Sequence, residues 1–332
     1  MAKVSVIGTT SWGTTLAIIL AQNGSDVFLW TRTWAEAELL KKDGQNIRFL
    51  AGHLFSDNLH VTASLDEAIP NSNVIVIGVP SQTFGENVEA FIPFLTDPCI
   101  VLSATKGLER LSGKRMSEIL LEKLPVSFHG KIGVLSGPNL SREVVQGKPS
   151  STVVASGHES VAKEIQDILG TPTFRVYTNA DVTGVELGGA LKNIIAIGSG
   201  INDGLGYGDN AKAAFITRGL AEITRLSVAA GANPTTMSGL AGIGDLIATC
   251  ASPLSRNRYV GEQLALGHKL SDIMSSMDNV AEGIYTTSAA LELATRLGVD
   301  MPITSITSQI LFEDLDVSAA VTQLMGRAPR PE

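Results

Sequence analysis

The sequence lacks the features that mark several classes of protein. It has only two cysteines, Cys99 and Cys250, far apart and without a histidine cluster, which argues against a disulfide framework and against a zinc site. No low-complexity segment stands out. The first residues lead directly into an apolar run without the charged, apolar and small-residue regions of a signal peptide, so a cytoplasmic location is expected.

Basic residues are also scarce, with 25 Lys and Arg against 33 Asp and Glu and a net charge of −8. Nucleic acid and anionic membrane surfaces require a basic footprint, so neither is an expected partner. A few lysines and arginines can still make a site locally positive for a small anionic ligand. A length of 332 residues, 44% hydrophobic and 17% charged, predicts a globular chain of two domains.

The most informative stretch, residues 185–200, predicts a helix that is buried on most sides. Its apolar residues are spread around the helix rather than along one stripe. Its glycines are tolerated chiefly where another backbone packs close. Glu186, Lys192 and Asn193 interrupt it too often for a membrane span. Lys192 is a candidate general acid, because desolvation lowers a lysine pKa toward the range used in proton transfer. Alternatively, its stem lies along apolar surface with its ammonium in water.

The N-terminal sequence predicts a strand at 3–7, a glycine turn, a helix over 16–22 and a second strand at 27–30. A helix N-terminus placed in this way can hold a pyrophosphate. Gly8 and Gly13 fit the dinucleotide fingerprint, but Thr10 replaces its middle glycine and should displace the cofactor or contribute a hydroxyl. After the second strand stands Arg32 rather than the acid that binds the ribose of NAD, which favours a 2′-phosphate; a solvated arginine is the alternative.

Further short apolar runs at 74–79, 99–103, 131–135, 151–155 and 173–177 predict five more strands in alternation with helices. Such a pattern predicts an α/β fold, with an N-terminal Rossmann-like doubly wound sheet over 1–179 and an all-α C-terminal domain over 180–332. Ligands bind beyond the carboxyl ends of strands in such sheets. Lys106 follows one of these ends and is either an anion or carbonyl ligand or a loop lysine in water.

Two motifs stand out in the helical half. Asp245 lies among small and apolar residues, where an unpaired carboxylate would be costly, so it is either the partner of Lys192 or a helix N-cap. Ser255, Arg256 and Asn257 offer a hydroxyl, a guanidinium and an amide in succession, which can bind a phosphate; a generic polar turn is the alternative. Residues 204–210 predict a glycine-rich turn that ends the long helix.

Taken together, these blocks resemble one family, the bacterial-type NAD(P)-dependent glycerol-3-phosphate dehydrogenases. The resemblance spans nearly the whole chain, in the order of the family, through residues 8–13, 104–108, 136–138, 191–193, 208–214, 217–220, 239–250, 255–257 and 281–283. It implies reversible hydride transfer between NADPH or NADH and dihydroxyacetone phosphate, giving sn-glycerol 3-phosphate for glycerophospholipid synthesis. A homodimer is expected. No metal-ligand set is visible, and none is needed when a lysine is the electrophile.

The resemblance also implies roles for individual residues. Lys192 matches the catalytic proton donor. The positions that match the substrate site are Lys106, Gly137, Asn139, Lys192, Asp245, Ser255, Arg256 and Asn257. The positions that match the cofactor site are Gly8, Ser11, Trp12, Gly13, Arg32, Lys106, Ser141, Arg256, Val280 and Glu282. Asn139 and Ser141 stand where the family more often has a hydroxyl residue and an alanine.

Two rival hypotheses remain at the level of sequence. An enzyme of the same architecture could reduce a keto acid or oxidise a sugar phosphate, although a carboxylate substrate would not need the group at 255–257. The second rival hypothesis is a binding protein with the fold of a dehydrogenase, in which Thr10 is the change that disabled cofactor binding.

Overall fold

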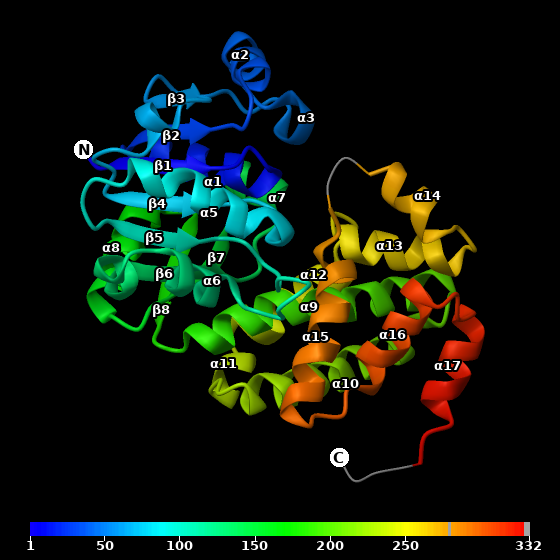
Figure 1. The fold of residues 1–332 in the computed structure, drawn as a ribbon. Coiled ribbons are helices and arrows are strands. Elements are labelled where there is room, and N and C mark those ends of the chain that lie inside the picture. The colour runs from blue at the N-terminus through cyan, green and yellow to red at the C-terminus, as the bar shows by residue number, and fades with distance from the viewer. Residues whose placement is uncertain (278–279, 329–332) are drawn as a thin grey trace. The chain divides into compact units, whose positions relative to one another are not determined.

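The computed structural model describes residues 1–277 and 280–328, which fall into two compact units (Figure 1). The first unit comprises Met1–Lys106 and Lys114–Glu186, and the second comprises Gly107–Gly113 and Leu187–Glu332. The sequence predicted the break between residues 179 and 180. The units divide seven residues later, after Glu186, whose carboxylate accepts hydrogen bonds from Arg115 and Ser117 of the first unit.

The first unit contains an eight-stranded sheet in the order β3-β2-β1-β4-β5-β6-β7-β8. All seven predicted strands are present: β1 (Lys3–Ile7), β2 (Asp26–Trp30), β4 (Val74–Ile77), β5 (Ile100–Ser103), β6 (Ile132–Ser136), β7 (Ser150–Ala155) and β8 (Phe174–Asn179). The unpredicted strand, β3 (Leu59–Thr62), pairs with β2 at one edge. The ladder is parallel except between β6 and β7, which are antiparallel. The α/β, doubly wound architecture is therefore confirmed.

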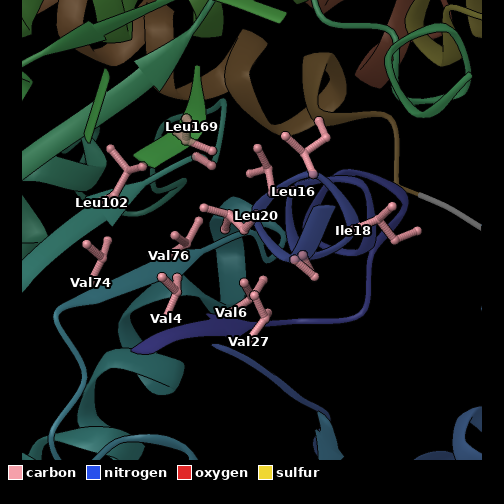
Figure 2. Close-up of a cluster of buried hydrophobic side chains, with 14 of the residues drawn as sticks. Val4, Val6, Leu16, Ile18, Leu20, Val27, Val74, Val76, Leu102 and Leu169 are labelled. Atoms are coloured by element: carbon pink, nitrogen blue, oxygen red, sulfur yellow. The ribbon is translucent and has the colours of Figure 1, made fainter. Parts of the chain in front are cut away.

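Successive residues of the central strands face opposite sides of the sheet and enter separate hydrophobic clusters. In β1, Val4 and Val6 belong to one cluster and Ile7 to another. Figure 2 shows the first cluster, in which Val6 lies with Leu16 and Leu20 of helix α1 (Ser11–Gln22). The second cluster contains side chains of α5 (Phe84–Phe91) and α6 (Met116–Lys123). Burial on both faces explains why these strands read as continuous apolar runs.

The remaining helices of the first unit are α2 (Trp34–Asp43), α3 (Ile47–Leu50), α4 (Leu65–Ala68), α7 (Ser141–Val145) and α8 (Glu159–Leu169). The second unit is built from helices, as expected. These are α9 (Val182–Gly204), α10 (Gly208–Ala229), α11 (Pro234–Met237), α12 (Asp245–Ala251), α13 (Arg256–Ala265), α14 (Leu270–Ser275), α15 (Glu282–Leu297), α16 (Pro302–Phe312) and α17 (Val317–Met325). The glycine-rich turn after α9 is shorter than predicted, because α10 begins at Gly208.

Helix α9 is buried on all sides over residues 187–200, as its apolar pattern predicts. Added Cβ atoms at Gly188 and Gly200 would lie 2.5 Å and 1.9 Å from backbone oxygens of other helices, which confirms close backbone packing there. At Gly198 the neighbour is instead the ring of Phe215, at 2.2 Å. Among the described residues no single helix has the length and apolarity to cross a membrane, although one bent pair, Pro234–Ala251 with Arg256–Ala265, meets those two criteria.

Candidate active site

The glycine turn of the first unit leads from β1 into α1 and leaves no room for side chains. Gly8 has φ +107°, a conformation that favours glycine, and an added Cβ would lie 2.6 Å from Val79 Cγ1. An added Cβ at Gly13 would lie 2.1 Å from the Gly8 carbonyl oxygen. These two glycines allow the tight turn that leads to the N-terminus of α1, and a helix N-terminus in this position can bind phosphates.

Thr10, in place of the middle fingerprint glycine, is the N-cap of α1. It adopts an ordinary extended conformation with φ −61°, so no glycine is required. Its hydroxyl oxygen accepts a hydrogen bond from Gly13 N at 3.1 Å. The same hydroxyl donates to the Gly78 carbonyl oxygen at 2.5 Å, joining the turn to the end of β4. Thr10 thus completes the turn as a structural cap rather than offering its proton to a ligand.

Ser11 and Trp12 occupy the first turn of α1. The Trp12 ring packs edge-on against Phe174 of β8, with ring centroids 6.4 Å apart, so much of this side chain serves the hydrophobic core. Its buried indole N–H has no hydrogen-bond acceptor within residues 1–277 and 280–328. Arg32 is exposed directly after β2, next to the buried Thr31.

Lys106 and Gly137 meet where β5 and β6 end. Lys106 Nζ donates to the Gly137 carbonyl oxygen at 2.7 Å, so Lys106 is held at the sheet edge, contrary to the alternative of a loop lysine in water. The Asn139 amide donates to Ser151 O at 3.0 Å and its oxygen accepts from Thr152 at 2.9 Å. Ser141 is the first residue of α7.

Lys192 of α9 forms a buried ion pair with Asp245 of α12. The Nζ–Oδ1 distance is 2.5 Å, and the two side chains are 7% and 2% exposed. The pairing predicted from the sequence is confirmed, and the alternative of an ammonium in water is excluded. Asp245 is not an N-cap, because α12 is capped at Gly244 and follows a π-helical turn over Leu240–Gly244.

A third residue, Thr249, completes this cluster. Lys192 Nζ also donates to Thr249 Oγ1 at 2.5 Å, and that hydroxyl donates to the Asp245 backbone oxygen at 2.6 Å. A carboxylate and a hydroxyl therefore compensate for burying the ammonium. Thr249 was not predicted from the sequence, although its position four residues after Asp245 places both on one face of a helix.

Asn193 and Asn257 link three helices. Asn257 donates to the Asn193 side-chain oxygen at 2.9 Å, and its own oxygen accepts from Gly283 N at 3.0 Å. An added Cβ at Gly283 would lie 2.7 Å from the Asn193 backbone oxygen, so only glycine fits here. The Asn257 side chain is thus largely used within the protein, which the polar pattern of 255–257 did not reveal.

The first turn of α13 carries the predicted phosphate motif. The Ser255 hydroxyl is the N-cap and accepts from Arg258 N at 3.3 Å. Arg256 is exposed at the first helical position, and its guanidinium donates to the Val280 carbonyl oxygen at 2.7 Å. Glu282 begins α15, just beyond Val280. The motif is therefore a helix N-terminus with a guanidinium beside it, rather than a generic turn.

Comparison with known proteins agrees with both units. Residues 3–162 match the family model for the N-terminus of NAD-dependent glycerol-3-phosphate dehydrogenase, and residues 181–322 match that for its C-terminus. A glycerol-3-phosphate dehydrogenase [NAD(P)+] of Chlorobium phaeobacteroides is 49% identical over 330 residues, covering 99% of each chain. The chain belongs to the NAD-dependent glycerol-3-phosphate dehydrogenase family.

Solved structures of glycerol-3-phosphate dehydrogenases share the fold of this family member. The enzyme of Coxiella burnetii has a TM-score of 0.93 at 36% identity, covering 98% of both chains. The enzyme of Saccharomyces cerevisiae has a TM-score of 0.82 at 28% identity, covering 97% of this chain and 99% of the other.

The first unit of this glycerol-3-phosphate dehydrogenase family member fits a nicotinamide dinucleotide. Gly8 and Gly13 allow the tight turn between β1 and the N-terminus of α1, the place where dinucleotide-binding folds hold the pyrophosphate. Ser11, Trp12 and Arg32 lie in the same unit, on the turn and just after β2. The described residues contain no group of three or more His, Cys, Asp or Glu able to hold a metal ion.

Proposed function

We propose that this protein reduces dihydroxyacetone phosphate to sn-glycerol 3-phosphate, reversibly, with NADPH or NADH. Its relatives of 45–49% identity are named glycerol-3-phosphate dehydrogenase [NAD(P)+]. The observation that carries the proposal for this chain is the buried Lys192–Asp245 pair, since it holds a lysine amine in the interior, where such a group can act as a general acid or base.

A reduced nicotinamide, when bound, would supply the hydride that adds to the carbonyl carbon. The carbonyl π electrons move to oxygen, and the Lys192 ammonium stabilises the oxyanion and then protonates it, so that C=O becomes CH–OH. Asp245 pairs with the ammonium at 2.5 Å, and the Thr249 hydroxyl helps to fix its direction. In the reverse direction, the neutral amine removes the hydroxyl proton.

The phosphate group of the substrate binds at the first turn of α13. Arg256 supplies a guanidinium able to form two parallel hydrogen bonds, and the backbone amides of this turn add the positive end of the helix dipole. Ser255 holds the turn as its cap. Because the Asn257 side chain bonds Asn193 and Gly283, we assign its contribution to its backbone N–H.

The other assignments complete this proposal. Lys106, Gly137 and Asn139 belong to the substrate site, where the Lys106 ammonium offers a second positive group. Gly8, Ser11, Trp12, Gly13, Arg32, Lys106, Ser141, Arg256, Val280 and Glu282 belong to the cofactor site.

Three properties of the protein in the cell extend the proposal. The product supplies glycerophospholipid synthesis, and the cytoplasmic location agrees with two cysteines that are both free thiols.

The protein forms a homodimer, the commonest symmetric assembly. Exposed apolar residues of the second unit, such as Val228 and Ile247, offer contacts. Light scattering coupled to size-exclusion chromatography tests this, and a monomeric mass would reject the dimer.

The deciding experiment measures oxidation of NADPH and NADH with dihydroxyacetone phosphate, together with a keto acid for comparison. We expect turnover only with the phosphorylated ketone. Lys192→Ala should abolish turnover while NADPH binding, followed by fluorescence, stays within a few-fold of wild type. Turnover of Lys192→Ala near the wild-type rate would remove Lys192 from the mechanism, and failure of the wild type to bind NADPH at millimolar concentration would favour a non-catalytic binding protein.

A further inference from the structure

A carboxylate lies where β2 ends, although the sequence has no acid at that position. Glu36, in the first turn of α2, extends one oxygen to the Thr9 hydroxyl and the other to the Thr31 hydroxyl, each at 2.5 Å. Thr9 belongs to the glycine turn after β1, and Thr31 is the residue after β2. The Glu36 carboxylate therefore joins the ends of two neighbouring parallel strands.

This arrangement differs from what the local sequence predicts. Thr33 and Glu36 have the spacing of a capping box, in which the glutamate side chain would return to the backbone of its own N-cap. Thr33 does cap α2 by accepting from Glu36 N at 3.2 Å. Both Glu36 carboxylate oxygens, however, accept from threonine hydroxyls of other segments. The side chain thus has a placement that helix capping does not explain.

In dinucleotide-binding folds, the end of β2 is where the adenosine ribose is recognised, through an acid for the 2′-hydroxyl or an arginine for a 2′-phosphate. The structure places groups of both kinds on one short segment, the exposed Arg32 and the anchored Glu36. We infer that Glu36 is a specificity-determining residue, which binds the ribose hydroxyl of NAD and opposes the 2′-phosphate of NADP. The inference rests on the proposed use of NADH and NADPH.

The chemistry of the carboxylate supports this assignment. Two oxygens offer about four acceptor positions, and the two threonines use one on each oxygen. The remaining acceptor positions of the carboxylate can accept a hydrogen bond from a ribose hydroxyl. A 2′-phosphate has mainly acceptor oxygens and a charge of about −1.5 to −2 at pH 7, so it is repelled by the carboxylate and attracted by the guanidinium. Opposite charges on one segment would keep the preference for either cofactor small.

The test measures binding rather than turnover. Calorimetric titration gives Kd for NADPH, NADH, adenosine 2′,5′-bisphosphate and ADP with the wild type, Glu36→Gln and a matched control, Glu38→Gln. Glu38 lies on the same helix but is exposed and pairs with Lys41 at 3.2 Å. We expect Glu36→Gln to shift the Kd ratio by about tenfold toward NADPH over NADH, and toward the bisphosphate over ADP, which corresponds to about 1.4 kcal/mol. The control should leave both ratios unchanged.

Several outcomes would overturn the inference. Ratios within twofold of wild type in Glu36→Gln would do so, as would an equal loss of affinity for all four ligands, which assigns the carboxylate only to holding the glycine turn. If Glu36→Gln does not fold, the variant with Thr9→Val, Thr31→Val and Glu36→Leu leaves no buried partner unsatisfied and must show the same shift. If the wild type binds neither NADH nor NADPH, the proposed function itself fails.

Discussion

Removing Asp245 tests the buried ion pair most directly. In Asp245→Ala the Lys192 ammonium, 7% exposed, loses a carboxylate 2.5 Å away. Breaking a buried pair by removing one partner costs about 3–5 kcal/mol, because an uncompensated charge is left in the interior. That is a large part of the total stability of a typical domain, about 5–15 kcal/mol. The cost is reduced if Lys192 gives up its proton, which in turn disables it as an acid.

A second variant separates the loss of stability from the loss of catalysis. Replacing both partners with apolar residues of similar volume, Lys192→Met with Asp245→Leu, leaves no buried charge and is often neutral for stability. We therefore expect the double variant to recover most of the stability that Asp245→Ala loses. Its turnover should stay reduced by about a hundredfold or more, since the proton donor is gone.

Urea denaturation of the wild type, Asp245→Ala and the double variant measures the free energy of unfolding. Far-ultraviolet circular dichroism follows the helices, whereas fluorescence follows the first unit, because all three tryptophans, Trp12, Trp30 and Trp34, lie there. Steady-state kinetics measures the turnover of the same three proteins. A double variant as unstable as Asp245→Ala, or an Asp245→Ala protein with wild-type stability and turnover, would refute the reasoning.

Three further results are expected. Arg256→Ala should raise the KM for dihydroxyacetone phosphate by about tenfold or more, through the loss of charge-assisted hydrogen bonds; an unchanged KM rejects the phosphate assignment. Gly261→Ala should lower the melting temperature, because its Cβ would meet a backbone oxygen at 1.9 Å, whereas Gly157→Ala, with open space around it, should not; equal melting temperatures contradict this. Burial raises the pKa of Cys99 to about 11 and that of Cys250 to about 12, so a thiol reagent at pH 8 should react slowly with the native protein, faster as pH rises toward 11, and fully after unfolding; rapid native reaction at pH 8 argues against it.

Much of the fold follows from local patterns. Seven strands were predicted because each is a short run of apolar and β-branched residues bounded by turns. Strand β3 was not predicted, because its four residues, Leu59–Thr62, include the exposed His60 and leave too short an apolar run. The antiparallel pairing of β6 and β7 could not be predicted either, because an apolar run carries no information on strand direction.

The candidate site, like the fold, could be predicted from the sequence only in part. Lys192 and Asp245 could be paired from the sequence because each is a charge in an apolar stretch, and burial forces such charges together. Glu36 gave no comparable signal. It has the spacing of a helix cap, and only the tertiary structure brings it to Thr9 and Thr31. The use of the Asn257 side chain likewise depends on Gly283, distant in sequence.

The chain enters the second unit twice, and this matters for anyone who exchanges or isolates its parts. Residues Gly107–Gly113 belong to that unit, where Leu108 is fully buried in its core and Arg296 donates to the Ser112 carbonyl oxygen at 3.1 Å. A fragment that begins at Leu187 would lack this segment and expose the hole left by Leu108. A hybrid of two relatives should therefore inherit residues 107–113 from the same parent as the C-terminal half.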